Sequence, residues 1–263
     1  MVSAPLLEVS GLSVSFGGVK AVDGIGFSVM PGEIFTIIGP NGAGKTSVIN
    51  LISRVYDASA GSIRFDAQEI GSLPAHGVAR RGIARTFQNI ELFERATVLQ
   101  NLLLGCYAGS DTGLWRQMAF TPKVRRQEEQ SRRRVEEVID FLEIEEYREQ
   151  LAGGLPYGVR KVVELARALV MRPRLLMLDE PSSGLNVEET DDMVFWIRDI
   201  RDQLGITVIM VEHDMRLVSA VSDRVLAMNQ GRALKLGSPG EVQTDPAVVE
   251  AYLGKRHRQE AAS

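Results

Sequence analysis

Residues 39–46 form a segment, GPNGAGKT, with the composition and spacing of a phosphate-binding loop. The segment fits the pattern G-x-x-x-x-G-K-[ST] at every fixed position. Its glycines permit positive φ angles and a close backbone approach, so that successive N–H groups can point at one phosphate. Lys45 would reach the β- and γ-phosphates, and the Thr46 hydroxyl would hold Mg²⁺. We therefore expect a nucleoside triphosphate here, bound by Gly39, Asn41, Gly42, Ala43, Gly44, Lys45, Thr46 and Ser47.

The segments on either side of this loop have the patterns of a buried strand and a helix. Residues 33–38 form a short, nearly continuous apolar run, which is typical of a strand buried on both faces. Residues 46–55 carry apolar side chains at helical spacing. This order places a bound anion at a helix N-terminus, where the helix dipole is favourable.

A second apolar run, at residues 175–178, is followed directly by two carboxylates, Asp179 and Glu180. The carboxyl ends of parallel strands form the edge at which open α/β sheets bind ligands. Asp179 suits the Mg²⁺ shell beside Thr46. Glu180 would polarise the attacking water as a general base, so we expect Glu180 and Lys45 to serve catalysis.

The composition of the chain excludes several other classes of protein. The 263 residues carry a net charge of −4, without the basic excess that indicates a nucleic-acid partner. One cysteine excludes an internal disulfide and fits a reducing compartment. No run of 18 apolar residues occurs, and residues 1–5 lack the features of a signal peptide. We expect a cytosolic protein that reaches a membrane only through a partner.

The order of predicted elements indicates an α/β fold with a helical insertion. Helix–strand alternation resumes after residue 159, which predicts a parallel sheet covered on both faces. Residues 83–89 are predicted to lead away from that sheet, and residues 123–150 to form one long charged helix. The expected division is an ATP-binding core (1–89 and 156–254), a helical subdomain (90–155) and a flexible tail (255–263).

Further segments occur in the order found in ATP-binding cassette proteins, and together with the two nucleotide motifs they make the chain similar to that family. Gln88 resembles the loop glutamine that senses Mg²⁺ and the γ-phosphate, and His213 resembles the switch histidine that contacts the γ-phosphate. Phe16 resembles the aromatic residue that stacks on adenine, with Val22 near the same ring, although a core role for Phe16 stays open. The segment similar to the family's dimer-contacting loop is Ser183, Gly184, Leu185 and Asn186.

The resemblance implies a P-loop NTPase with a RecA-like parallel sheet, an N-terminal antiparallel β-subdomain at about 6–32 and 61–70, and an inserted α-helical subdomain. It also implies an ATPase that uses ATP and Mg²⁺, with Thr46, Gln88 and Asp179 at the metal and His213 joining Glu180 and Lys45 in catalysis.

The family's signature segment usually reads LSGGQ and binds the γ-phosphate held by the opposite cassette of a dimer. The matching residues here are Leu155, Pro156, Tyr157 and Gly158. Pro156 offers neither a hydroxyl nor an N–H, so the segment should lose one charge-assisted hydrogen bond, worth about 1.5–3 kcal/mol. The Gly158 amide and the helix dipole remain.

Residues 16–23, 82–89 and 211–215, together with the C-terminal segment 237–254, resemble one group within this family, the ATP-binding subunits of branched-chain amino acid type importers. The resemblance implies a second cassette, two permease subunits and a periplasmic binding protein as partners, at the cytoplasmic face of the bacterial inner membrane. It leaves open the substrate and the choice between homodimer and heterodimer. Apolar residues around Trp115 are a candidate contact with the permease or bilayer edge, with packing inside the helical subdomain as the alternative.

Two other functions within this family stay open at this point. One is a cassette that exports lipid or lipopolysaccharide. The other is an ATPase of translation or DNA repair, which usually has a second cassette or a long coiled-coil insertion that these 263 residues lack. A P-loop kinase gives no reason for Glu180, Gln88 and His213 to occur together.

Overall fold

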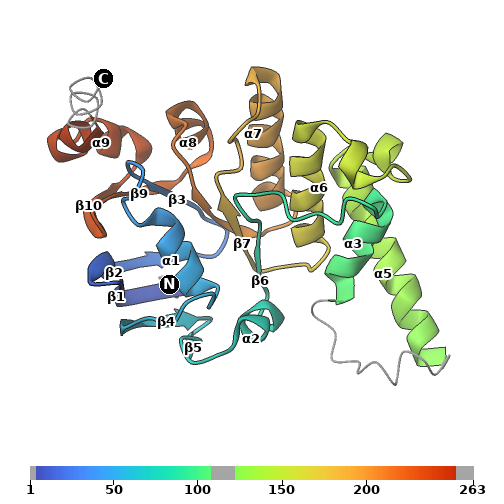
Figure 1. Cartoon of the computed structure of the whole chain (residues 1–263), viewed down its shortest axis with the longest axis horizontal. Coiled ribbons are helices and arrows are strands. Elements are labelled where there is room, and N and C mark those ends of the chain that lie inside the picture. The colour runs from blue at the N-terminus through green and yellow to red at the C-terminus, as the bar shows by residue number, and fades with distance from the viewer. Residues whose placement is uncertain (1–3, 108–121, 253–263) are drawn as a thin grey trace.

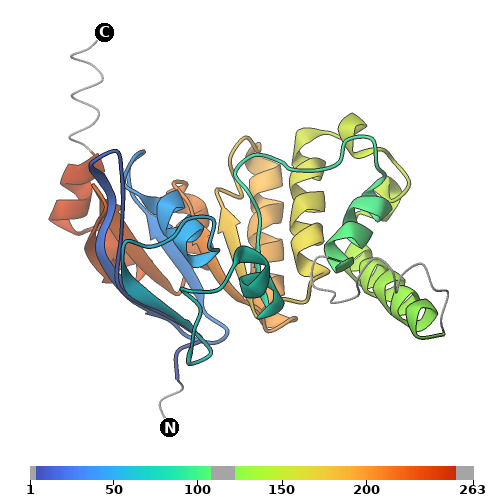
Figure 2. The same cartoon turned by 60° about the horizontal axis from the view of Figure 1, so that its bottom comes forward.

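The computed structural model describes residues 4–107 and 122–252. The candidate permease contact around Trp115 and the predicted flexible tail at 255–263 lie outside the described residues. Within these ranges, two β-sheets and a set of helices form a three-part arrangement, with the small sheet at one end and the helices α3 and α5 at the other (Figures 1 and 2).

The smaller sheet is antiparallel and has the strand order β2-β1-β4-β5. Its alternating sequence places apolar residues on the buried face, and Gly17 and Gly18 form a two-residue turn with positive φ angles of 53° and 84° between the first two strands. The strands are β1 (Leu7–Phe16), β2 (Val19–Val29), β4 (Ala60–Phe65) and β5 (Gln68–Glu69).

The larger sheet has six strands in the order β10-β9-β3-β8-β7-β6, parallel throughout except for β10. The prediction that residues 83–89 lead away from the sheet is wrong at its start, because β6 pairs with β7 as an edge strand. Three residues are too few to show a periodicity in sequence. The strands are β3 (Ile34–Ile38), β6 (Ile83–Arg85), β7 (Leu175–Asp179), β8 (Thr207–Val211), β9 (Arg224–Asn229) and β10 (Arg232–Gly237).

The helices follow the predicted order with one clear difference. The helix predicted at 123–150 ends at Phe141, because Glu143 takes a left-handed φ of 55° and a 3₁₀ turn, η1 (Glu145–Tyr147), follows. The helices are α1 (Lys45–Ile52), α2 (Ala75–Arg80), α3 (Val98–Tyr107), α5 (Pro122–Phe141), α6 (Tyr157–Leu169), α7 (Val187–Asp202), α8 (Met215–Val221) and α9 (Pro239–Gln243), with a second 3₁₀ turn, η2 (Ala152–Gly154).

Alternation along the buried strands divides the core into two faces. Leu175 and Met177 of β7 join α1 and the smaller sheet in one hydrophobic cluster. Leu176 and Leu178 point the other way and pack with helices α6, α7 and α8. Because successive side chains of a strand point to opposite faces, one apolar run packs against both layers that cover the sheet.

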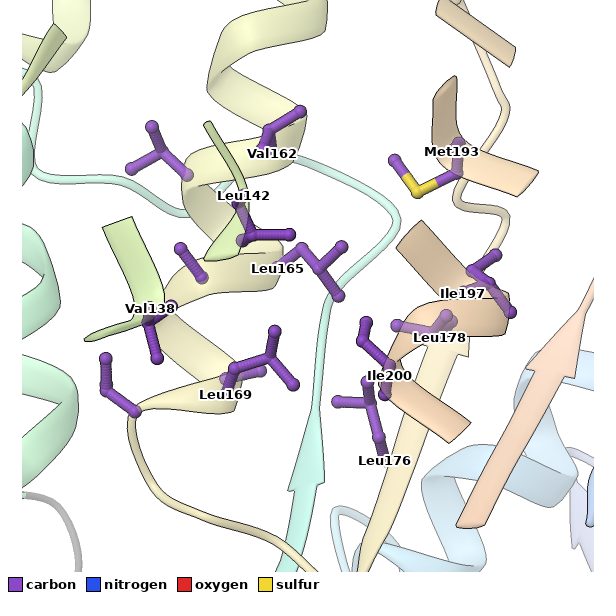
Figure 3. Packing of buried hydrophobic residues seen from close by; sticks show 14 of the residues in the cluster. Val138, Leu142, Val162, Leu165, Leu169, Leu176, Leu178, Met193, Ile197 and Ile200 are labelled. Carbon is purple, nitrogen blue, oxygen red and sulfur yellow. The ribbon is translucent and has the colours of Figure 1, made fainter. Parts of the chain in front are cut away.

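Helix α6 connects the large sheet to helices α3 and α5. Figure 3 shows Val162, Leu165 and Leu169 of α6 between two residues on one side, Val138 of α5 and Leu142 just after it, and the side chains of β7 and α7 on the other. Because this cluster is continuous, the boundary between an ATP-binding core and a helical subdomain stays a prediction. Among the described residues, no helix is long and apolar enough to cross a bilayer.

Helix α7 begins with a reciprocal cap that should contribute measurably to stability. The Asn186 side chain accepts a hydrogen bond from Glu189 N at 3.0 Å, and Glu189 Oε2 accepts one from Asn186 N at 2.9 Å. Replacing Asn186 by alanine removes the first bond and should lower the free energy of unfolding by about 1 kcal/mol. Urea denaturation measures this, with Val187→Ala as the exposed control, expected within about 0.5 kcal/mol of the wild type. Equal losses in both variants would contradict the capping role.

Candidate nucleotide-binding site

The predicted phosphate loop lies between β3 and α1, at the carboxyl end of the central strand. Gly39 has a φ of 154° and Gly44 a φ of 99°. A Cβ at Gly39 would lie 2.2 Å from Met228 O, and one at Gly44 would lie 2.2 Å from Ala21 O. Both glycines are therefore required by close backbone approach as well as by conformation.

A cavity of about 380 Å³ opens above this loop. It brings most of the predicted phosphate-loop residues together with two residues from distant segments, Gln88 and Glu180. Ala21, which the sequence analysis did not single out, also contributes. The lining residues are Ala21, Asn41, Gly42, Ala43, Gly44, Lys45, Thr46, Ser47, Gln88 and Glu180.

The ammonium group of Lys45 is turned back onto its own loop. Lys45 is 6% exposed, and Nζ donates to Gly39 O at 2.8 Å and to Pro40 O at 3.5 Å. These bonds supply acceptors to a buried cation. An entering phosphate offers charged oxygen acceptors, which form stronger hydrogen bonds than main-chain carbonyls do.

Asp179 lies at the centre of a buried polar group beneath the loop. Thr46 Oγ1 donates to Asp179 Oδ1 at 3.4 Å, and Arg85 Nη2 donates to Asp179 Oδ2 at 2.9 Å. Burial raises the pKa of Asp179, while the charge and hydrogen bond of Arg85 oppose that rise. The Thr46 hydroxyl and the adjacent carboxylate oxygen are hard donors on neighbouring elements, and this donor set fits Mg²⁺.

Arg85 is a member of this site that the sequence analysis did not assign. It lies on β6, and its Nη1 donates to Asn50 Oδ1 at 2.6 Å and to Ser53 Oγ at 3.0 Å. Asn50 belongs to helix α1, and Ser53 is the residue that follows this helix. Its side chain is 8% exposed and that of Asp179 is fully buried. Arg85 therefore connects the edge strand β6 to the phosphate-loop helix α1 and, through its buried ion pair with Asp179, to β7.

Glu180 follows β7 in an unusual backbone conformation. Its φ is 52°, in the left-handed region that residues with a Cβ rarely adopt. Its amide donates to Val211 O at 2.9 Å, and Gln88 Nε2 donates to its Oε2 at 3.0 Å. The structure thus places the two predicted γ-phosphate residues in direct contact at the mouth of the cavity.

His213 lies in the loop after β8, with a side chain that is 53% exposed. The preceding residue, Glu212, holds this loop and is completely buried. Its Oε1 accepts bonds from Ser182 N at 2.9 Å and Ser182 Oγ at 2.7 Å, and its Oε2 accepts one from His213 N at 2.9 Å. Glu212 was not predicted, and it joins the loop of His213 to the residues that follow Glu180.

The segment that departs from the signature pattern forms the start of helix α6. Pro156 is the N-cap and is exposed, as is Tyr157, while Leu155 and Gly158 are buried. Tyr157 Oη donates to Ser183 O at 3.3 Å. Its ring also approaches Gly184, where an added Cβ would lie 2.8 Å from Tyr157 Cε1. The structure therefore brings the predicted signature segment against the predicted dimer loop.

The two residues predicted to contact adenine differ in solvent exposure. Phe16 ends β1, is 44% exposed and meets the ring of Tyr56 edge-on, with centroids 5.1 Å apart. Val22 is fully buried in the hydrophobic cluster. Stacking by Phe16 stays a prediction. The contact of Val22 with adenine stays a prediction as well.

Comparisons with known proteins extend these similarities along the chain. The sequence profile of the ABC transporter family matches residues 22–183, and that of the branched-chain amino acid ATP-binding cassette transporter family matches residues 237–258. The chain is 42% identical over 253 residues to the high-affinity branched-chain amino acid transport ATP-binding protein BraF of Pseudomonas aeruginosa, covering 96% of this chain and 99% of that protein. It is 39% identical to the corresponding protein LivG of Escherichia coli K12, with the same coverage.

Solved structures give the same picture of the fold. The ADP conformation of an ATP-binding cassette of an ABC transporter superposes with a TM-score of 0.84 and 30% identity, over 96% of this chain and 100% of that chain. A nucleotide-free ATP-binding cassette from an ABC transporter gives a TM-score of 0.83 at 30% identity, over 95% of this chain and 99% of that chain.

Proposed function

The chain belongs to the ABC transporter family and is an ABC-type ATPase, and we propose that it is the ATP-hydrolysing subunit of a bacterial importer for branched-chain or related amino acids. The names of BraF and LivG support this substrate class, since both match over nearly their whole length. The observation that carries the proposal is the single cavity that collects the phosphate loop, Gln88 and Glu180. The similarity to importers disfavours the lipid-export and non-transport alternatives.

The residues that line the cavity, together with His213, support the following assignment of the chemistry. The loop amides and Lys45 bind the β- and γ-phosphates, and Glu180 orients a water molecule opposite the leaving β-phosphate oxygen. As the water oxygen bonds to the γ-phosphorus, its proton passes to the Glu180 carboxylate and the bond from the γ-phosphorus to the β-phosphate oxygen breaks. ADP and phosphate leave. His213, at the end of the next strand, supplies a donor to the γ-phosphate.

The proposed metal is Mg²⁺, which Thr46, Asp179 and Gln88 would hold. When bound, it would neutralise charge on the β- and γ-phosphate oxygens. The chain's own contribution is to orient the Asp179 carboxylate and to oppose the rise in its pKa that burial causes. The charge of Arg85 does this from the side opposite Thr46.

We propose that the exposed start of α6 faces the ATP of a second cassette. The amides and the dipole of a helix N-terminus attract a phosphate even where the protein offers no side-chain hydroxyl. Pro156 removes one such amide, so the ATP site that is weakened is the one on the partner. The ATP site built on Lys45, Glu180 and His213 depends instead on the partner's signature segment. This arrangement favours a heterodimer with a partner whose signature segment is complete.

The proposed assembly adds two permease subunits and, indirectly, a periplasmic binding protein, at the cytoplasmic face of the inner membrane. ATP-driven closure of the two cassettes would transmit force to the permeases, and hydrolysis would reopen them. Gln88 and the helices α3 and α5 are the proposed region of contact with the permease subunits. Gln88 lines the cavity and also precedes the helical segment in the chain.

Uptake of labelled amino acids tests the import proposal. Deleting the gene in its own organism should abolish high-affinity uptake of leucine, isoleucine or valine, while uptake of glutamate serves as the unrelated control. The wild-type gene should restore uptake, and the Glu180→Gln gene should not. A tagged copy should also co-purify with permease subunits from detergent-solubilised membranes. Unchanged uptake of all three amino acids after deletion would contradict the proposed substrate class.

A further inference from the structure

Helix α6 carries a buried lysine, Lys161, to which neither the sequence analysis nor the proposed mechanism gives a role. Lys161 is 4% exposed. A cation so far from water is costly unless strong acceptors surround its head group. The apolar face of α6 is packed between α5 on one side and β7 and α7 on the other (Figure 3). The acceptors that Lys161 reaches therefore show what the residue holds in place.

The acceptors are main-chain carbonyls of the two residues that meet at the mouth of the cavity. Lys161 Nζ donates to Gln88 O at 3.4 Å and to Glu180 O at 3.4 Å. The side chains of these same two residues are bonded to each other, Gln88 Nε2 to Glu180 Oε2, at 3.0 Å. The three residues thus form a closed ring of hydrogen bonds that starts on α6, outside the phosphate cradle.

A hydrogen-bond donor to the Glu180 carbonyl helps to stabilise the unusual backbone conformation of this residue. Its residue has a left-handed φ of 52°, a conformation that persists in a residue with a Cβ only when its surroundings determine it. Ser183 N donates to the same carbonyl at 3.1 Å, and the Glu180 amide donates to Val211 O at 2.9 Å. Lys161 adds a charged donor from a different element, and a charged donor is the stronger kind.

Carboxylates around Lys161 offset part of the cost of burying its charge. Burial lowers the pKa of Lys161, while the carboxylates of Glu164, Glu212, Glu180 and Asp179 oppose that shift. The Tyr157 ring lies 6.0 Å from Nζ and covers it from the side of the signature segment. The ammonium therefore presents donors to the two carbonyls in a site from which water is largely excluded.

We propose that Lys161 is a positioning residue for ATP hydrolysis, which holds the backbone of Glu180 and the loop of Gln88 in the one arrangement that places both side chains at the γ-phosphate. The inference rests on the proposed role of Glu180 as the general base. Lys161 lies outside the phosphate cradle, so its loss should change the rate of the chemical step and leave ATP binding nearly intact. A small displacement of a catalytic carboxylate is enough to slow a reaction strongly.

The test compares Lys161→Met, Lys161→Arg and the control Arg172→Met in the transporter assembled with its own partners. Methionine keeps the length of the stem and removes the donors. We expect it to lower kcat for phosphate release by about 10- to 100-fold, with the affinity for a fluorescent ATP analogue within about twofold. Arginine keeps charge and donors and should stay within about threefold of the wild-type kcat. Arg172 pairs with Glu137 on the surface, and its loss should leave kcat unchanged.

A second readout separates positioning from general loss of structure. Hydrogen exchange at the amides of residues 182–185 should accelerate in Lys161→Met, while exchange in β7 stays as in the wild type. If Lys161→Met does not fold, Lys161→Gln is measured in the same way. A wild-type kcat in Lys161→Met beside an inactive Glu180→Gln would overturn the role of Lys161 alone. Undiminished hydrolysis in Glu180→Gln would overturn the proposed function and this inference with it.

Discussion

Replacing Glu180 by glutamine should lower ATP hydrolysis by the assembled transporter by about 10²- to 10³-fold, because an amide cannot accept the proton of the attacking water. ATP binding should survive. The substitution keeps the shape of the side chain, and its amide oxygen can still accept the bond that Gln88 Nε2 now gives to Glu180 Oε2. The closed, ATP-bound pair of cassettes should therefore accumulate.

Phosphate release and binding of a fluorescent ATP analogue measure the two effects separately. Glu188→Gln provides the matched control, since Glu188 is an exposed carboxylate in the first turn of α7. It should hydrolyse ATP at the wild-type rate. Activity of Glu180→Gln close to that of the control would contradict the role of Glu180 as general base.

The same variant also tests which of the two ATP sites, the one on this chain or the one on the partner, hydrolyses most of the ATP. If Pro156 weakens the site on the partner, then Glu180→Gln in this chain should remove most of the activity of the complex. The matching change in the partner should remove less, because that site already lacks a charge-assisted hydrogen bond worth about 1.5–3 kcal/mol. If the partner's change alone abolished hydrolysis, the assignment of the competent site to this chain would be wrong.

The parts of the site that the sequence predicts are those encoded by contiguous residues. The phosphate loop depends on glycines whose positions are fixed relative to Lys45 and Thr46, and the structure shows the close approaches at Gly39 and Gly44 that demand them. Asp179 and Glu180 could be placed because the apolar run at residues 175–178 leads directly into them. In each case a local pattern carries the physical requirement.

The parts that sequence reasoning missed are held by contacts between distant segments. Arg85 meets Asp179 across 94 positions of sequence, and Ser182 meets Glu212 across 30. Lys161 bonds to Gln88 across 73 positions. A charged residue on a short strand or inside a helix has the same local pattern whether it faces solvent or a buried partner. The strand order decides between the two, and the sequence predicted that order only in outline.

Replacing Arg85 by methionine should lower the free energy of unfolding by about 3–5 kcal/mol at neutral pH, because it leaves the buried Asp179 carboxylate without its partner. Methionine fills similar space, so the loss reflects charge and hydrogen bonding more than a cavity. The substitution also removes the bonds to Asn50 and Ser53, which anchor α1 to the edge strand. Nucleotide binding that depends on Mg²⁺ should weaken along with stability.

The loss should depend on pH in a defined direction. Burial already raises the pKa of Asp179 above its usual value of 3.8, and Arg85 opposes that rise, so its removal raises the pKa further. A carboxyl whose pKa is raised on folding contributes stability below its unfolded pKa and loses that contribution as the pH rises through the folded value. The difference between wild type and Arg85→Met should therefore be largest at neutral pH and shrink as the pH falls towards 3.8.

Urea denaturation across this pH range measures the effect, and the chain offers a matched control in Arg174→Met. Arg174 also pairs with an aspartate, Asp66, but the two side chains are 53% and 56% exposed, so the loss should stay below about 1 kcal/mol. The double variant Arg85→Met/Asp179→Asn should recover part of the stability, because no buried charge is then left unpaired. If Arg85→Met and Arg174→Met cost the same at every pH, the buried pair does not hold the site together.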